Sequence, residues 1–175
     1  SFLKANTAFW ILCSASLIGG IGTTMGSKSF VYYINYYTGH PEAVSSVMAL
    51  GILGSAIGIP VWTMVARSLT KRSVWIIGGC GALLGYIALF AFEVQDVSIL
   101  SALTFCNGFF GGGLAVMFWS MLPDTVEYGQ LRTGVRDDGI VFGLSQLIAK
   151  AGSGIGVGLI GFLLSFVGYV ADHDQ

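Results

Sequence analysis

The sequence predicts an all-α membrane protein with about five transmembrane helices. Hydrophobic residues make up 54% of the 175 residues and charged residues only 10%, whereas an ordinary soluble domain carries roughly a quarter charged residues. The charges fall in short clusters that are separated by apolar gaps of about twenty residues or more, the length that crosses a bilayer. Backbone polar groups in hydrocarbon must bond within their own segment, so each gap is expected to be a helix.

The gaps place the five spans in order along the chain. We expect helices over roughly residues 5–38, 43–66, 73–92, 98–121 and 139–170, with a connection at 122–138. The first and last are long enough to tilt or kink. Glycine recurs at small-xxx-small spacing in these spans, as at Gly54 and Gly58, which lets helix backbones approach closely. A soluble protein with buried helices is the alternative, but such a protein would rarely repeat this pattern five times.

Several classes of function are not expected from this sequence. The net charge of −1 argues against a nucleic-acid partner, because phosphate recognition needs a basic face. His40 and His173 have no ligands near them in sequence, so no metal site is expected. Cys13, Cys80 and Cys106 fall inside expected spans and are interpreted as inert packing residues. No span supplies a nucleophile–base pair, so an enzyme is not expected, and neither is a cofactor.

The distribution of basic residues predicts the orientation, because Lys and Arg prefer cytoplasmic connections. The connection 67–72 carries three of them and 122–138 carries two, whereas 39–42 and 93–96 carry none. We therefore expect a multi-pass protein of the inner (plasma) membrane, with the first residue cytoplasmic and the last residue external. The chain begins and ends at span edges, so we also expect it to be a fragment of a longer protein.

Lys150 is the most informative single residue. It lies about 11 residues into the last span, roughly 16 Å deep at 1.5 Å per residue, where a charge costs about 3 kcal/mol on insertion scales. Its ammonium group must therefore face a polar cavity or a carboxylate. Every acidic residue of the chain falls in a connection or at a span edge, so the anion is expected from another part of the protein or from a substrate. A purely structural ion pair is the alternative.

Lys28 is the other cation inside a span, near Asn35 and a cluster of aromatic residues that includes Tyr32. Two interpretations stay open. The tyrosines could form an interfacial aromatic belt, with Lys28 near the end of the hydrocarbon. Alternatively, Lys28 and Asn35 line a cavity, and a tyrosine such as Tyr32 stacks on a sugar ring.

The stretch 121–139 carries charges of both signs. Pro123 and Asp124 are typical of a helix start, and Gly129 and Gly134 are expected to break the helix that would start there. The charges could form a salt-bridge network at the membrane surface, or they could belong to a solvated loop.

This stretch resembles the signature of the glycoside–pentoside–hexuronide:cation symporters, a family within the major facilitator superfamily. The matching residues are Asp124-Thr-Val-Glu127-Tyr128-Gly129, Thr133-Gly134, Arg136, Gly139 and Lys150. The basic connection 67–72 also resembles a loop of a facilitator half, and the resemblance covers the whole chain. Two positions depart from the pattern: Gln130 replaces an acid, which could weaken an ion pair, and Asp138 replaces a Glu but keeps its charge.

The resemblance implies the seventh to eleventh spans of twelve, that is, most of a C-terminal six-helix half. The N-terminal half and the last span would then be missing partners, and the fragment would be inactive alone. The implied function is symport of a sugar or glycoside with Na⁺ or H⁺ by alternating access. A carrier of the same fold for a non-sugar substrate, such as a lysolipid or a drug, is the alternative.

The resemblance also implies roles for individual residues. Lys150 would bridge the sugar and cation sites, and Gln146, one turn earlier, would bond a sugar hydroxyl. A cytoplasmic gate would close the outward-facing state, and it would be formed by Asp124, Glu127, Tyr128, Arg132 and Arg136.

Overall fold

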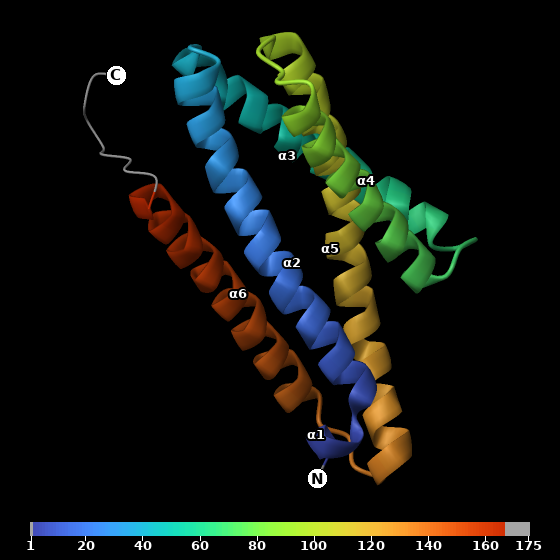
Figure 1. The fold of residues 1–175 in the computed structure, drawn as a ribbon. Helices are drawn as coiled ribbons and strands as arrows, with labels where there is room; N and C mark the ends of the chain where they lie inside the picture. Colours follow the sequence, from blue (N-terminus) through green and yellow to red (C-terminus); the bar gives the residue numbers. More distant parts are fainter. Residues whose placement is uncertain (1, 167–175) are drawn as a thin grey trace. The chain divides into compact units, whose positions relative to one another are not determined.

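The computed structural model describes residues 2–166. Its helices are α1 (Phe2–Ala5), α2 (Thr7–Tyr32), α3 (Val44–Val65), α4 (Lys71–Ala91), α5 (Val97–Thr133) and α6 (Asp138–Phe166) (Figure 1). A π-helical turn, Tyr33–Tyr37, continues α2, and a 3₁₀ turn, Pro41–Ala43, precedes α3. The predicted all-α architecture is confirmed.

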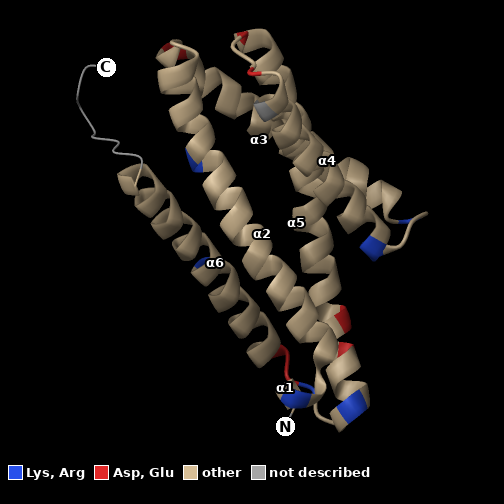
Figure 2. Ribbon diagram, in the orientation of Figure 1, with Lys and Arg blue, Asp and Glu red and all other residues tan. Residues whose placement is uncertain are grey.

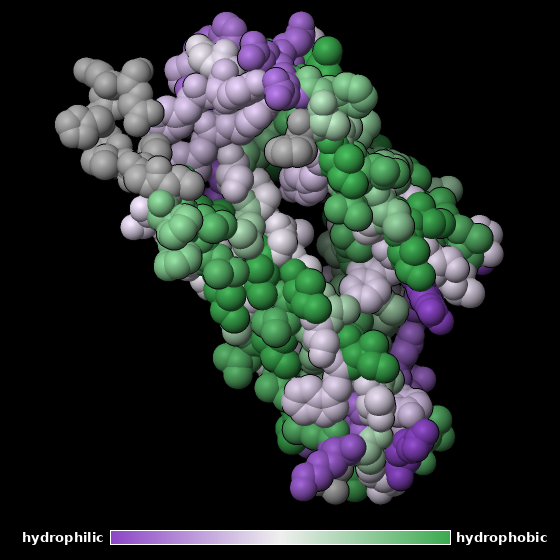
Figure 3. All heavy atoms as spheres, in the orientation of Figure 1, coloured by the Kyte–Doolittle hydropathy of each residue, from purple (hydrophilic) through white to green (hydrophobic). Residues whose placement is uncertain are grey.

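Within residues 2–166, five segments are long and apolar enough to cross a membrane. They are Thr7–Tyr37, Pro41–Val65, Lys71–Leu89, Val97–Thr133 and Asp138–Phe166. Large apolar side chains on these helices are exposed, for example Ile52 at 72% and Phe162 at 65%. Such exposure is unfavourable in water but not against lipid. Figure 3 shows hydrophobic side chains along the helices and hydrophilic ones near their ends, as expected for membrane spans.

The observed helix bounds differ most from the expected ones in α5. This helix continues past the expected end of the span at residue 121 and reaches Thr133. Pro123 lies inside the helix, not at its start, and the expectation that Gly129 breaks the helix is wrong. Gly134 does follow the helix, with φ of +73°, a left-handed conformation that glycine adopts readily. The expected end of the last span and the tail after it, residues 167–175, lie outside the described residues.

The described helices form two compact units. Unit 1 contains residues 2–31 and 125–166, and unit 2 contains residues 32–124. The chain passes from one unit to the other near the end of α2 and within α5.

Close backbone approach holds α3 against α5 in unit 2. A Cβ placed on Gly54 or Gly58 would collide with the carbonyl oxygens of Phe105 and Phe109, respectively. The Trp62 indole donates to the Phe109 carbonyl at 2.9 Å. Trp62, Val74 and Met117 form a buried cluster that joins α3, α4 and α5. The expected tight glycine packing is therefore present in this unit.

Glycines also set the approach of α6 to α2 in unit 1. A Cβ on Gly152 would lie 2.8 Å from the Leu17 carbonyl oxygen, and one on Gly156 would lie 3.0 Å from that of Ile21. The buried residues of α6 are Val141, Ser145, Gly152, Gly156 and Ile160. Their spacing of three to four residues, or a multiple of it, places them on one face of the helix.

Candidate functional site

Lys150 lies on the exposed side of α6. It follows the first residue of that helix by twelve positions, which is roughly 18 Å along the axis at 1.5 Å per residue. Figure 2 shows a blue position partway along α6, whose only basic residue is Lys150. Among the described residues of unit 1, no carboxylate lies within 4.0 Å of its ammonium nitrogen. Within the described part of unit 1, the charge of Lys150 is therefore not compensated by a direct ion pair.

Gln146 is half-buried and lies one turn before Lys150 on α6. Residues four apart in a helix are neighbours on its surface, so the amide and the ammonium group share one side. The glycines Gly143 and Gly154 flank them, and a Cβ at either would have no atom within 4 Å. This side of α6 is therefore sterically open in its own unit, in contrast to the side that packs on α2.

The residues proposed around Lys28 fall in different units. Lys28 is exposed in unit 1, whereas Tyr32 and Asn35 are half-buried in unit 2. Tyr32 stacks on Tyr36, with ring centroids 6.3 Å apart. Tyr36 itself is 64% exposed, which fits an aromatic belt as well as a binding surface, so both interpretations of Lys28 remain.

The π-helical turn contacts the turn between α4 and α5, an arrangement that sequence reasoning did not predict. The Tyr33 hydroxyl donates to the Val94 carbonyl at 2.7 Å, and the Tyr37 hydroxyl donates to the Glu93 carboxylate at 3.3 Å. Glu93 has φ of +45°, an uncommon conformation for a non-glycine residue. Sixty-one residues separate Tyr33 from Val94, so no local motif could have indicated the pair.

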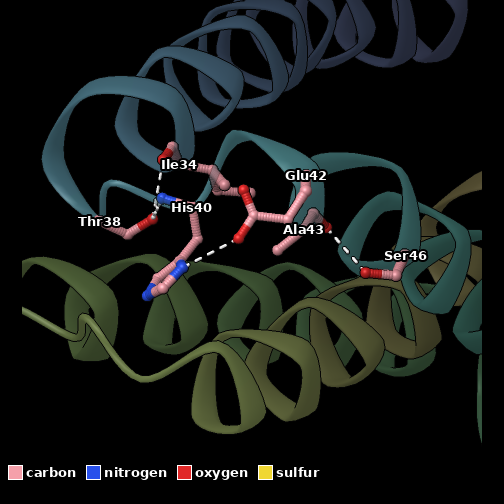
Figure 4. A network of polar contacts seen from close by, with 6 residues as sticks. All are labelled: Ile34, Thr38, His40, Glu42, Ala43 and Ser46. Carbon is pink, nitrogen blue, oxygen red and sulfur yellow. Dashed lines mark hydrogen bonds and ion pairs between the residues drawn. The ribbon is translucent and has the colours of Figure 1, made fainter.

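Two acidic residues near this end make local contacts. Asp96 accepts the N–H groups of Ser98 at 2.7 Å and Ile99 at 3.3 Å, and these bonds lower the pKa of its carboxyl below the usual value. His40 Nδ1 lies 3.1 Å from Glu42 Oε1 (Figure 4). The described residues contain no group of three or more His, Cys, Asp or Glu that could hold a metal ion.

At the opposite end of α4, Lys71 binds Asp124. The Lys71 ammonium lies 2.7 Å and 2.8 Å from the two carboxylate oxygens and donates to the Ser120 carbonyl at 2.9 Å. Lys71 opens α4 behind the cap Thr70, whose hydroxyl accepts the Ser73 N–H at 3.1 Å. A cation at a helix N-terminus is opposed by the helix dipole, so the Asp124 carboxylate offsets an unfavourable placement.

The other expected gate residues make shorter-range contacts in unit 1. Arg136 forms a two-pronged pair with Asp138, at 2.8 and 3.0 Å. Bonding to Asp138, and more weakly the charge of Glu127, raise the pKa of the Arg136 guanidinium. The Arg132 guanidinium lies 5.1 Å from the Tyr128 ring centroid, a cation–π distance. The charges thus form separate pairs within each unit.

Comparison with known proteins decides the family. The sequence profile of the MFS/sugar transport proteins matches residues 2–175, which is nearly the whole chain. The chain belongs to this family. This is a family of membrane transport proteins and not of enzymes.

Relatives of this MFS/sugar transport protein include carriers with differing names. It is 32% identical to an isoprimeverose transporter of Lactiplantibacillus pentosus over 99% of the chain. It is 30% identical to a glucuronide carrier protein homolog of Escherichia coli K12, again over 99% of the chain. A putative 2,3-dihydroxypropane-1-sulfonate exporter of the same strain is 29% identical over 99% of the chain. The chain spans 36%, 38% and 37% of the lengths of these three proteins.

Proposed function

We propose that the chain forms part of a secondary active carrier that moves a sugar or glycoside across the plasma membrane together with Na⁺ or H⁺. Membership of the MFS/sugar transport family supports the carrier class. Lys150 supports the coupling: it is a cation on the open side of α6 with no acidic partner among the described residues of its own unit. Such a charge is costly in hydrocarbon unless it serves a polar pathway.

The proposed mechanism is alternating access around a site near the middle of the membrane. Lys150 bridges the sugar and the coupling cation, because its ammonium group can donate to a hydroxyl and to a shared carboxylate. That carboxylate is proposed to come from outside the described residues of unit 1. Gln146, on the same side of α6, offers both an acceptor and two donors to a sugar hydroxyl. Lys28, Asn35 and Tyr32 are proposed as further contacts of the substrate.

The gate proposed for the cytoplasmic end uses pairs that can break and reform. Asp124 is held by Lys71, and Arg136 is held by Asp138. All four side chains are between 40% and 54% exposed. Exposed pairs are worth roughly 0–1 kcal/mol, so opening them adds little to the barrier of a conformational change.

Replacing Lys150 tests the coupling. In the intact protein, Lys150→Leu is expected to abolish cation-driven accumulation, because the link between the two sites is lost while the helix keeps its apolar surface. Lys150→Arg is the matched control: it keeps the charge and is expected to retain part of the accumulation. Uptake against a gradient is measured at equal amounts of inserted protein. Near-normal accumulation by Lys150→Leu would exclude the proposed role.

A panel of labelled solutes identifies the substrate class. We expect competition by methyl β-D-glucuronide, isoprimeverose or melibiose. A second candidate, a carrier of a non-sugar solute, is favoured by the relative named as a putative 2,3-dihydroxypropane-1-sulfonate exporter. Transport of that sulfonate without competition by any of the three glycosides would favour the second candidate.

A further inference from the structure

Phe2 and Asn6 pack on the gate segment of α5, that is, residues 124–132, which carry most of the proposed cytoplasmic gate. The buried side-chain amide of Asn6 joins the start of the described chain to this segment. Asn6 lies between α1 and α2 and is 0% exposed. Its Oδ1 accepts the Phe9 N–H at 3.1 Å. Its Nδ2 donates to the Thr125 carbonyl at 2.8 Å, across 119 residues of sequence. Burial of an amide is costly unless it is bonded, so both bonds fix the position of this side chain.

Gly129 of α5 is a point at which Phe2 and Asn6 approach the helix closely. A Cβ at this position would lie 2.5 Å from two atoms of the Phe2 ring and 2.7 Å from the Asn6 amide nitrogen. Gly129 is buried within α5. Its close contact with Phe2 and Asn6 accounts for a glycine at this position, although the local sequence predicts a helix break there. The Trp10 indole donates to the Leu3 carbonyl at 2.9 Å, which ties α1 to the first turns of α2.

The contacts lie beside the candidate gate. Thr125 and Gly129 flank Glu127 and Tyr128 in the same turns of α5, and Tyr128 contacts Arg132. The structure assigns Asn6 as a positioning residue: it ties the chain that enters α2 to the gate segment of α5, so that the two move together. This assignment rests on the proposed carrier function, because it links the proposed gate mechanically to the residues that enter α2.

A simple helix-capping role must be separated from this link. The acceptor of Asn6 caps α2, whereas its donor reaches α5. Asn6→Asp keeps an oxygen for the Phe9 N–H, and Asp is a good cap, but an ionised carboxylate has no hydrogen to donate to Thr125. Asn6→Ala removes both bonds. A property that depends on the bond to Thr125 should therefore change equally in both variants. A property that depends on the cap of α2 should change only in Asn6→Ala.

Amide hydrogen exchange of the intact protein, reconstituted in lipid, measures the loss of the α2 cap and the loss of the bond to Thr125 separately, and it needs no transported solute. In Asn6→Asp we expect exchange across residues 129–133 to rise about tenfold, with Phe9 and Trp10 within twofold of wild type. In Asn6→Ala we expect both regions to exchange faster. Exchange across 129–133 that stays within twofold in Asn6→Asp would overturn the assignment.

A second pair of variants tests the same contact sterically. Gly129→Ala is expected to raise exchange in residues 2–6, since its Cβ collides with the Phe2 ring, and adding Phe2→Ala should relieve most of that change. Gly143→Ala is the matched control, because the new Cβ meets no atom within 4 Å. Equal behaviour of Gly129→Ala and Gly143→Ala would contradict the packing of Phe2 on α5.

Uptake then separates a positioning role from a merely structural one. With methyl β-D-glucuronide or isoprimeverose as labelled solute, Asn6→Asp is expected to lower the maximal rate about tenfold and leave KM within twofold. An unchanged maximal rate would overturn the positioning role. A wild-type protein that carries neither solute, with the exchange pattern as expected, would contradict the sugar-carrier proposal and leave the link between Asn6 and α5 intact.

Discussion

The Asp124 carboxylate receives the Lys71 ammonium from a helix that begins 53 residues earlier. The side chains are 54% and 40% exposed, respectively, so the pair contributes at most about 1 kcal/mol to stability. Its placement is more informative than its strength. Lys71 lies in the first turn of α4, where the helix dipole disfavours a cation. Loss of Asp124 therefore removes the ion pair and also leaves the unfavourable interaction of Lys71 with the helix dipole without compensation.

A double-mutant cycle tests this pair. Lys71→Met and Asp124→Asn are each expected to slow uptake, and the double variant should be no slower than the worse single variant, because both remove one interaction. The charge exchange Lys71→Asp with Asp124→Lys should recover part of the rate, since it places an anion at the N-terminus of α4. Initial uptake rates and the thermal midpoint in detergent are compared. Effects that multiply in the double variant would show that the residues act independently.

The ion pairs of the mixed-charge stretch 121–139 show why the sequence indicates candidate residues but not the partners that they contact. Asp124, Arg132 and Arg136 stood out because mixed charges gather in one stretch. Lys71 was visible only as part of a basic connection, and nothing in its spacing indicates Asp124. The sequence likewise makes Tyr32 a candidate but does not predict the bond from Tyr33 to Val94, because a contact across 61 residues depends on the packing of helices.

At the scale of the elements, α3 and α5 meet through glycines that leave no room for side chains. A Cβ on Gly54 would overlap the Phe105 carbonyl and approach the Phe109 nitrogen at 3.0 Å. The partner is backbone, which cannot rotate away as a flexible side chain would. The two helices must therefore separate to accept even an alanine.

Gly54→Ala is expected to destabilise unit 2. Overpacking typically costs about 1–3 kcal/mol, which for a chain of this size lowers Tm by roughly 2–12 °C. Gly111→Ala is the control, since its Cβ would meet no atom within 4 Å while it gains the same helix propensity. Thermal unfolding of the purified protein in detergent provides the comparison. A Gly54→Ala variant as stable as Gly111→Ala would mean that α3 and α5 are not in backbone contact.

The positions of the long helices can be predicted because charges are excluded from hydrocarbon, so that each span is a long segment with few or no charged residues. The end of α5 was not predictable by the same rule. Pro123 is a usual helix-start signal, yet Pro is tolerated within membrane helices when the rest of the helix is supported. Gly129 was interpreted as a break because its packing partner, Phe2, lies at the far end of the sequence. The error at both positions comes from judging a residue by its local propensity alone.

At the scale of the whole molecule, five helices within residues 2–166 are long and apolar enough to cross a membrane. Five crossings would place Phe2 and Phe166 on opposite sides of the membrane. The basic connections 67–72 and 122–138 and the non-basic connections 39–42 and 93–96 alternate along the chain. The proposed orientation follows from this alternation, because Lys and Arg are retained on the cytoplasmic side during insertion. The Lys71–Asp124 pair agrees with it, since it joins the first residue of α4 to a residue in the last third of α5, within the basic connections that the proposal places on the cytoplasmic side.

Cysteine accessibility tests the orientation on the two ends of α4. After Cys13, Cys80 and Cys106 are replaced by serine, single variants Ser68→Cys and Gln95→Cys place a thiol at exposed positions before and after that helix. A membrane-impermeant maleimide added to intact cells is expected to label Gln95→Cys at least tenfold faster than Ser68→Cys, and inverted vesicles should reverse the ratio. Because α4 separates the two thiols, labelling of both from one side would contradict its passage through the membrane. A reversed ratio in intact cells would instead preserve the span and invert the topology, which would place the pairs formed by Asp124 and Arg136 on the outer surface and exclude them as a cytoplasmic gate.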